Sequence, residues 1–189
     1  MKTLFFAALL AAALDLSACS SRPPWADGRL VTERVSGQIE PQDLSELPAR
    51  ILALHNGERR RVGAPDLEWD ESLAASAGPF ASHLARIGRL QHSDVAGRPG
   101  QGENLWLGTR RAYSVEEMVG GWAAERALFR PGTFPAVSSS GEWSDVGHYT
   151  QMVWPSTTRV GCAVRSSIEW DVLVCRYAPA GNVVGMRIP

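Results

Sequence analysis

Two segments near the C-terminus each combine alternating apolar and polar residues with a single cysteine. They are residues 159–165 and 170–177. An alternation of period two is typical of strands with one buried face, and the short polar stretch between the segments predicts a hairpin. In such a hairpin Cys162 and Cys175 become neighbours on adjacent strands, within bridging distance. The chain is therefore expected to fold around a sheet that contains this pair.

The N-terminus has the pattern of an export signal. Lys2 gives a positive start, residues 4–14 form a short apolar run, and Leu16-Ser17-Ala18 supplies small residues before Cys19. The apolar run is too short to span a bilayer. A cysteine directly after Leu-Ser-Ala resembles the lipobox of bacterial lipoproteins, which implies that residues 1–18 are removed and that Cys19 is lipidated. The alternative is an ordinary cleaved signal that leaves a free thiol.

Export determines the expected location and the expected state of the cysteines. Because Ser20 follows Cys19, the anchored protein is expected at a bacterial outer membrane or in the periplasm, with the lipid bilayer as its partner; without lipidation it would be secreted. Export also implies an oxidising compartment. Removing Cys19 from the total of three leaves an even pair, which predicts a disulfide between Cys162 and Cys175. A metal pair is the lesser alternative, since the spacing differs from that of zinc knuckles.

The length of 189 residues suits a signal followed by one domain. Residues 19–44 contain prolines, glycines and scattered charges and are interpreted as a flexible tether, so the domain is expected over residues 45–189. A hydrophobic fraction of 44% and a charged fraction of 21% indicate an ordinary globular protein. The formal net charge of −1 gives no reason, by itself, to expect nucleic acid or acidic lipid as a partner.

Three helices and one further strand are expected in the first part of this domain. The first helix begins after a Ser45 cap, and the second runs from an Asp70 cap to Gly88 with a kink at an internal proline. A short strand is expected over residues 103–107. The capping box Ser114-Val115-Glu116-Glu117 opens the third helix.

The third helix carries a carboxylate on its apolar face. Glu125 follows Trp122 by three residues and Met118 by seven, so it projects from the face that these side chains bury. A carboxylate is rarely buried without a partner, because desolvation of an unpaired charge costs several kcal/mol. Glu125 is therefore expected to find a hydrogen-bond donor, or else to extend past Arg126 into solvent.

A second ionisable group lies among apolar neighbours closer to the C-terminus. After a long loop over residues 130–141, a short helix capped by Ser144 or Asp145 is expected to carry the stretch Gly147-His148-Tyr149-Thr150-Gln151-Met152-Val153-Trp154-Pro155-Ser156-Thr157. A histidine in such company is either a packed core residue or part of a site. His148 is thus a candidate whose role depends on the rest of the chain.

Several blocks of the sequence resemble one known family. Two long blocks, Gly147 to Thr157 and Val172 to Val183, resemble the signature motifs of the CAP superfamily, also called the SCP domain, which groups cysteine-rich secretory proteins, insect venom antigens and plant pathogenesis-related proteins. The shorter blocks that resemble its remaining motifs, in the right order, are His55-Asn56 with Arg59, Leu67-Glu68-Trp69 and Gly102-Glu103-Asn104-Leu105.

This resemblance implies a fold and a site. The implied fold class is α+β, a three-layer α-β-α sandwich with a small, mainly antiparallel sheet. The implied site is a cleft lined by His92, Glu103, Glu125 and His148. In several members the two histidines bind a divalent cation, so His92 and His148 are the expected ligands of zinc or another divalent cation. The family's C-terminal cysteine pair also matches Cys162 with Cys175.

Two functions are compatible with these residues. The first is an envelope-anchored binding module whose cleft holds a cation and a lipid, sterol or glycan ligand. The alternative is a metal-assisted or Glu/His-dependent hydrolase of envelope peptides or glycans, with Glu103 and Glu125 as catalytic groups. We expect binding rather than catalysis, because no activated nucleophile and no complete three-ligand zinc motif can be identified locally. His55, Asn56 and Arg59 are interpreted as residues that hold helix and loops together.

Overall fold

The computed structural model describes Val31–Thr32 and residues 43–189. In this part of the chain the elements are β1 (Val31–Thr32), α1 (Leu47–Arg61), β2 (Glu68–Trp69), α2 (Glu71–Ile87), η1 (Val95–Gly97), β3 (Gly102–Thr109), α3 (Val115–Ala124), η2 (Glu125–Ala127), β4 (Gly132–Thr133), η3 (Trp143–Val146), α4 (Gly147–Met152), β5 (Arg159–Ser166), β6 (Trp170–Ala178) and β7 (Arg187–Ile188).

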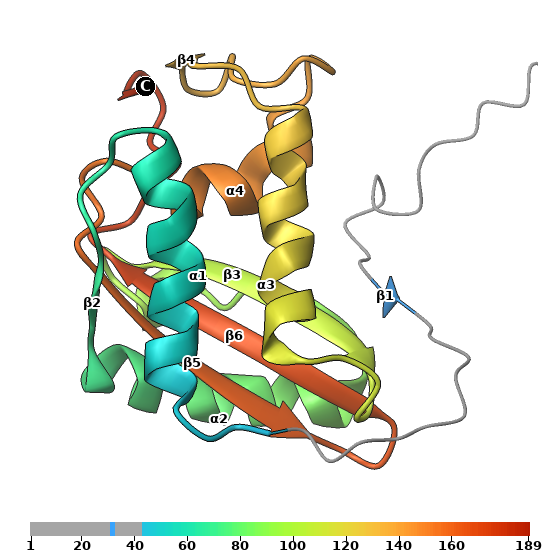
Figure 1. Cartoon of the computed structure of the whole chain (residues 1–189). Coiled ribbons are helices and arrows are strands. Elements are labelled where there is room, and N and C mark those ends of the chain that lie inside the picture. Colours follow the sequence, from blue (N-terminus) through green and yellow to red (C-terminus); the bar gives the residue numbers. More distant parts are fainter. Residues whose placement is uncertain (1–30, 33–42) are drawn as a thin grey trace, which may run out of the picture.

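A five-stranded sheet with the order β1-β3-β6-β5-β2 lies between two layers of helices (Figure 1). Helix α2 packs on one face, against β5 and β6, and α1, α3 and α4 lie over the other. The three long central strands are antiparallel, whereas the two-residue edge strands pair in parallel. The α+β class and the three-layer sandwich with a mainly antiparallel sheet are therefore confirmed.

The hairpin of β5 and β6 forms as expected, and its register explains the cysteine pairing. Cys162 lies directly opposite Cys175, and the two are joined by a disulfide with a Cα–Cα distance of 4.1 Å. Both side chains are buried under the α1 and α3 layer. The predicted disulfide is confirmed, and the alternative of a metal pair is wrong.

The helix ends show which of the predicted caps form. Asp70 accepts hydrogen bonds from the backbone N–H groups of Ser72 and Leu73, and the left-handed Gly88 ends α2. Ser114 and Glu117 form the expected capping box. The predicted Ser45 cap is wrong: α1 begins after Glu46, whose φ is 51° and whose side chain makes no capping bond. A serine cap requires extended backbone, which the chain does not have at this turn.

Each face of the sheet has its own apolar core. The larger cluster lies under α1, α3 and α4 and includes Trp122, Tyr149 and Trp154, all with at most 1% of their surface exposed. The smaller cluster lies under α2 and is built mainly from alanine, leucine and valine. The buried residues of both clusters lie between Ile51 and Ile188.

Arg59 is the most deeply buried charged group of the larger core. Its guanidinium donates to the carbonyls of Met152, Trp154 and Thr157 at 2.8–3.0 Å, and its Nε donates to a fourth, that of Pro65. Burial lowers the pKa of Arg59 to about 10. This side chain holds the turn after α4 against α1, as predicted.

His55 and Asn56 complete the same network. Asn56 exchanges two hydrogen bonds with the backbone of Leu67, which holds the segment before β2. His55 contacts the carbonyl of Ile51 and the hydroxyl of Tyr177, and burial lowers the pKa of His55 to about 4. All three residues therefore have the structural role expected of them.

Most of the N-terminal predictions concern residues that the structure does not describe. The signal over residues 1–18, the lipidation site Cys19 and most of the tether over residues 19–44 lie outside the described residues. Within that tether only Val31–Thr32, which pairs with β3, and the residues from Asp43 on are described. Among the described helices, none has the length and apolar character needed to cross a membrane.

Candidate functional site

Glu125 and His148 form the first of two histidine–carboxylate pairs. Glu125 follows the last residue of α3, and its carboxylate accepts a 2.6 Å hydrogen bond from Nδ1 of His148. It also accepts from the backbone N–H groups of His148 and Tyr149, both at 3.0 Å. The donor that Glu125 required is thus the first turn of α4 together with the ring that this turn carries.

This carboxylate replaces the cap that the sequence predicted for α4. Neither Ser144 nor Asp145 caps the helix; Asp145 instead accepts a hydrogen bond from Ser140. A negative charge at a helix N-terminus is favoured by the free N–H groups there, whichever segment supplies it. Because Glu125 is more than twenty residues from α4 in sequence, a search for local caps cannot find it.

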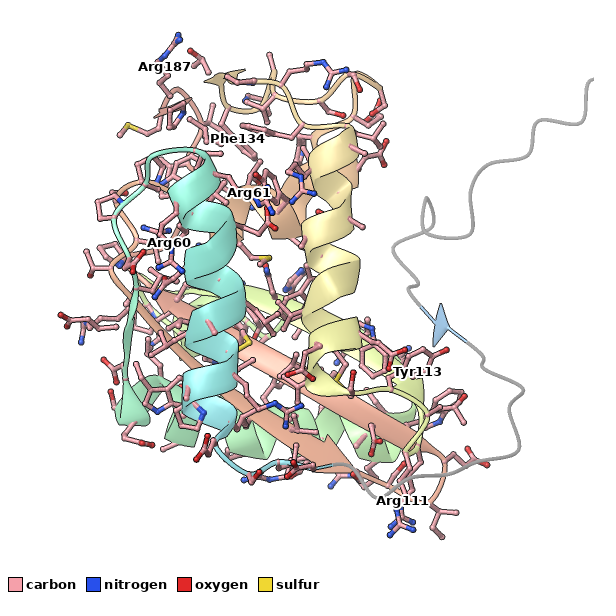
Figure 2. All side chains as sticks on the ribbon, in the orientation of Figure 1. Arg60, Arg61, Arg111, Tyr113, Phe134 and Arg187 are labelled. Carbon is pink, nitrogen blue, oxygen red and sulfur yellow. A yellow bond between two sulfur atoms is a disulfide. The ribbon has the colours of Figure 1, made fainter. Side chains whose placement is uncertain are left out.

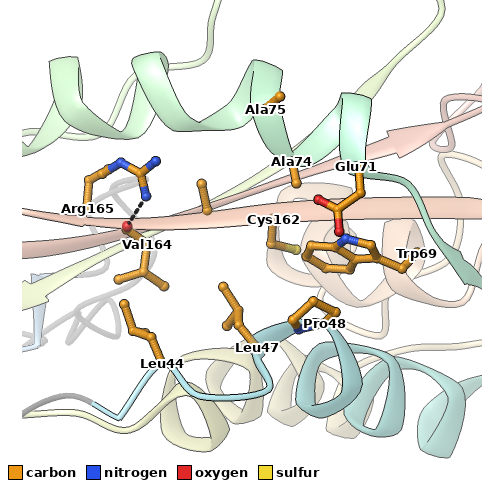
Figure 3. A pocket seen from close by; sticks show the side chains of 11 residues that line it. Leu44, Leu47, Pro48, Trp69, Glu71, Ala74, Ala75, Cys162, Val164 and Arg165 are labelled. Carbon is orange, nitrogen blue, oxygen red and sulfur yellow. Dashed lines mark hydrogen bonds between the residues drawn. The ribbon is translucent and has the colours of Figure 1, made fainter.

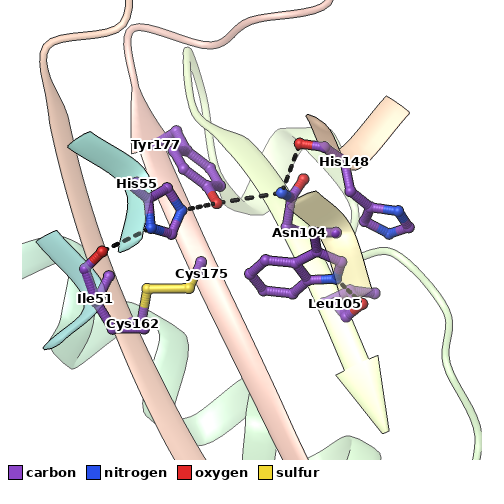
Figure 4. The surroundings of a disulfide bond; sticks show 9 residues. Ile51, His55, Asn104, Leu105, His148, Cys162, Cys175 and Tyr177 are labelled. Atoms are coloured by element: carbon purple, nitrogen blue, oxygen red, sulfur yellow. Dashed lines mark hydrogen bonds between the residues drawn. A yellow bond between two sulfur atoms is a disulfide. The ribbon is translucent and has the colours of Figure 1, made fainter. Parts of the chain in front are cut away.

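The His148 ring has a defined orientation. It stacks on Trp122 of α3, with ring centroids 5.9 Å apart and planes inclined by 9°. The Trp122 N–H donates to the carbonyl of Leu105 in β3. Asn104, next to Leu105, donates to the His148 carbonyl (Figure 4). With Nδ1 bound to Glu125, the ring presents Nε2 as its remaining polar atom.

His92 and Glu103 form the second pair. Nδ1 of His92 lies 2.9 Å from Oε1 of Glu103, so the same ring nitrogen contacts a glutamate as in the first pair. The Glu103 side chain is fully buried, whereas 59% of the His92 side chain is exposed. Ser93 adds two further donors to the carboxylate, its backbone N–H and its hydroxyl. The imidazole is therefore held from one side by a buried carboxylate and open to solvent on the other.

Two arginines lie close to the carboxylate of Glu103. Its carboxylate lies 3.6 Å from the Arg176 guanidinium and 3.9 Å from that of Arg98. Burial by itself would raise the pKa of Glu103, but the hydrogen bonds from His92 and Ser93 and the charge of Arg98 outweigh burial and lower it. Glu103 is thus held as a carboxylate.

The two pairs approach the beginning of β3 from opposite faces of the sheet. Glu103 lies opposite Arg176, which reaches Ser76 of α2. Asn104 points to the other face, where it contacts His148. Strand β1 pairs only with Leu107 and Gly108, so among the described strands none covers this half of the β3 edge. The pairs therefore flank an open strand edge.

The four side chains provide only part of the ligand set of a metal ion. Within residues 43–189 no group of three or more His, Cys, Asp or Glu side chains has the arrangement needed to hold one. Each histidine nevertheless has a carboxylate on Nδ1, the arrangement that orients metal-binding imidazoles. The chain thus offers two prepared nitrogen donors, Nε2 of His92 and Nε2 of His148, and a cation bound there would need its other ligands from water or a bound molecule.

The predicted site residues are thus paired, two by two, as His92 with Glu103 and His148 with Glu125. Sequence reasoning missed the groups around them, namely Arg98, Arg176 and the stacked Trp122. Alternation along β6 places Arg176 on the face opposite to Cys175, but only the strand register puts it beside Glu103.

The hollow in Figure 3 lies away from both pairs. It has a volume of about 300 Å³ and is bounded by the start of α1, by α2 and by the outer edge of β5. Leu44, Leu47 and Trp69 give it an apolar wall, and Arg165 donates to the edge carbonyl of Val164 at 2.8 Å. A charged side chain of this kind discourages pairing with a further strand.

Comparison with known proteins gives a consistent result. The profile of the cysteine-rich secretory protein family matches residues 52–177. The chain is 37% identical over 141 residues to a PR-1 type pathogenesis-related protein of Sambucus nigra, covering 74% of this chain and 80% of that one. It is 36% identical over 154 residues to pathogenesis-related protein 1 of Arabidopsis thaliana, covering 81% and 89%.

A solved structure agrees with these relatives. The crystal structure of NaASP2 with Zn2+ superposes with a TM-score of 0.61 at 26% identity, over 76% of this chain and 85% of that one. The profile spans well over half of the present sequence and the fold matches as well. This chain belongs to the cysteine-rich secretory protein family, the CAP superfamily.

Proposed function

We propose that this protein is a binding module of the cell envelope, in which His92 and His148 hold a divalent cation, zinc first, at the open edge of β3. The single observation that carries the proposal is that both rings use Nδ1 for a glutamate and keep Nε2 for a ligand. A carboxylate behind each imidazole is the usual support of a zinc-binding histidine. The relative NaASP2 was crystallised with Zn2+, which supports zinc as the first cation to test.

The state of the glutamates favours binding over catalysis. Glu103 accepts from three donors and faces two arginines, so its pKa is lowered and it is a poor proton donor near neutral pH. Glu125 is occupied by two backbone N–H groups of α4. Both carboxylates thus act as supports of the histidines. Hydrolysis of envelope peptides or glycans remains the second proposal, and any such activity should disappear in Glu103→Gln or Glu125→Gln.

The proposal is tested by calorimetric titration of zinc into residues 20–189, which retain the whole described domain and lack Cys19. The expected result is one zinc per chain, lost in the double variant His92→Ala/His148→Ala. His83→Ala is the matched control, because His83 lies on the outer surface of α2 beside Phe80 and Arg86. Equal zinc binding by the double variant and by His83→Ala would rule out this site.

A bound lipid, sterol or glycan is proposed as the second component of the site, because two protein nitrogens leave two of the four positions of a tetrahedral zinc ion to other ligands. Organic extraction of the purified domain followed by mass spectrometry tests this part. A ligand present in the parent protein and absent from the double histidine variant supports it, whereas extracts with no ligand contradict it.

The envelope location is proposed from the likeness of Leu16-Ser17-Ala18-Cys19 to a lipobox. The expected anchor is lipid on Cys19, which joins the domain to the bilayer. Fractionation of cells that express Cys19→Ser should find the protein released from membranes. Retention of that variant in the membrane fraction would contradict lipid anchoring at this residue.

A further inference from the structure

The turn between β5 and β6 exposes one large apolar side chain at an end of the molecule. Ile168 is 88% exposed, the highest value among the large apolar residues of the described chain. The turn is well anchored, because Ser167 N–H donates to the Trp170 carbonyl and Trp170 packs against Gly88 at the end of α2. Ile168 is thus presented to solvent by a structured turn.

Four arginines come from the segments next to this turn, and we call them with Ile168 the basic tip: Arg86, Arg89, Arg110 and Arg111. They belong to the end of α2 and the residues just after it, and to the loop after β3. Arg86 and Ile168 line one hollow of about 550 Å³, and the Arg110 N–H donates to the Glu169 carbonyl of the turn. Figure 2 shows Arg111 at this same end of the sandwich, far from Phe134 and Arg187.

The charges of the basic tip are not neutralised within the described domain. None of its four arginines forms an ion pair with a described acidic side chain, and Arg86 contacts only the ring of His83. The carboxylates nearby are Glu169 and Asp171, and Asp171 is buried and bonded to Ser166 and to the Arg111 N–H. At the opposite end, by contrast, Arg60 and Arg126 are paired with Asp66 and Glu58. The chain as a whole has a net charge of −1, so the positive charge is local to this end.

We infer that the basic tip docks on the surface of a lipid bilayer that contains anionic headgroups, with Ile168 inserted between them. Arginines without a carboxylate partner are attracted by the negative surface potential of such a bilayer. A soluble polyanion would satisfy the arginines equally well, but it offers no apolar phase for Ile168. The combination of one exposed aliphatic tip with a ring of cations therefore fits a membrane better than a polymer.

The path of the chain agrees with this orientation. Val31 and Thr32 pair with Leu107 and Gly108, only a few residues before Arg110. A chain held by lipid at Cys19, as proposed above, can span at most about 40 Å to reach Val31. The anchor would therefore keep the basic tip within reach of headgroups. Glu103 lies about 20 Å from this end along β3, so docking would leave the histidine pairs clear of the bilayer.

The test is co-sedimentation of residues 20–189 with vesicles, since this chain has neither Cys19 nor the apolar run that precedes it. Vesicles of phosphatidylglycerol and phosphatidylcholine in equal amounts are compared with phosphatidylcholine alone. The expected result is partitioning at least about tenfold stronger on the anionic vesicles, with further weakening as salt is raised. Equal partitioning on both vesicle types would overturn the proposal.

Two variants and one control locate the contact. Ile168→Asp, and separately Arg89→Gln/Arg111→Gln, should each lower partitioning by at least about tenfold. Val184→Asp is the matched control, since Val184 is 75% exposed and lies in the C-terminal segment at the other end of the molecule (Figure 1). It should change partitioning by less than about twofold. Loss in the arginine variant without loss in Ile168→Asp would indicate a polyanion-binding surface and would contradict insertion. Circular dichroism of each variant checks that it is folded.

Discussion

The carboxylate of Glu125 accepts hydrogen bonds from both the ring and the backbone N–H of His148. One side chain therefore orients the imidazole that is the candidate metal ligand and caps the first turn of α4, the helix that carries it. The same atoms therefore serve the fold and the site. A change at Glu125 is therefore expected to affect both the stability of the domain and the binding of a cation by His148.

Glu125→Gln is expected to destabilise the domain by about 1–3 kcal/mol, because the neutral amide accepts fewer hydrogen bonds and removes the negative charge from the start of α4. Urea unfolding followed by circular dichroism measures the change. Glu142→Gln is the control, since Glu142 precedes η3 and its side chain makes no capping bond. Equal unfolding midpoints for the two variants would mean that Glu125 does not support α4.

Arg59→Met should be among the most destabilising single changes in the chain. It leaves four buried carbonyls without their donor, and each costs about 1–3 kcal/mol when unsatisfied, less where water enters. Arg60→Met, the neighbouring change, removes only an exposed pair with Asp66 and should cost less than about 1 kcal/mol. Thermal unfolding of both proteins compares them. Similar melting temperatures would contradict the role assigned to Arg59.

His55 is expected to make stability depend on pH above the range in which carboxylates titrate. Its Nδ1–H donates to the Ile51 carbonyl, and its Nε2 accepts from Tyr177, whose hydroxyl accepts from Asn104 (Figure 4). A ring bonded in this way is satisfied only when neutral. Burial lowers its pKa to about 4 in the folded protein, against about 6.5 in the unfolded chain.

The unfolded chain therefore binds the extra proton first, and stability should fall as the pH drops from about 6.5 to about 4, by about 3 kcal/mol in total. Above pH 6.5 His55 should add no pH dependence. The measurement is urea unfolding at a series of pH values for the parent protein and for His55→Gln, with His83→Gln as a control on the α2 surface. A slope between pH 6.5 and 4.5 that persists unchanged in His55→Gln would assign it to other groups.

The disulfide should contribute to stability but not to the pairing of β5 with β6. The double variant Cys162→Ala/Cys175→Ala is expected to lose about 2–3 kcal/mol, because the bridge closes a loop with a sequence separation of 13. The strands should still pair, since consecutive residues of both strands are buried and both faces of the hairpin are therefore covered. Denaturant unfolding with and without reductant gives the value. Two titratable thiols in the denatured, unreduced protein would show that the bond is absent.

The parts of the fold that could be predicted from the sequence depend on near neighbours. Asp70 and Ser114 cap their helices because the acceptor and its donors lie within three residues, and the alternation along β5 and β6 directly implies a sheet. The Ser45 cap failed because the left-handed backbone of Glu46, set by the approach to α1, overrides the local preference. A local sequence signal is therefore reliable only where neighbouring residues also determine the backbone conformation.

The parts of the site that could not be predicted depend on long-range contacts. Helical periodicity showed that Glu125 needs a donor, yet that donor lies twenty-three residues away in another helix. Similarly, one of the two arginines near the Glu103 carboxylate is Arg176, which only the register of β3 with β6 brings close. The resemblance to the family identified the four site residues, but only the structure shows that each glutamate accepts several hydrogen bonds.

Glu103→Gln provides the sharpest test of the idea that the glutamates support ligand-binding histidines. The amide retains the shape of the carboxylate but cannot hold the His92 ring with the same charge, so zinc affinity should fall by about 10–100-fold. Stability should fall as well, because Arg98 and Arg176 lose their counter-charge. Calorimetric titration of zinc at a temperature well below unfolding separates the two effects. Glu71→Gln is a matched control, since Glu71 is exposed at the start of α2 and contacts neither histidine. If zinc affinity is unchanged while stability falls, the Glu103 carboxylate braces the two arginines and plays no part in preparing His92 for a cation.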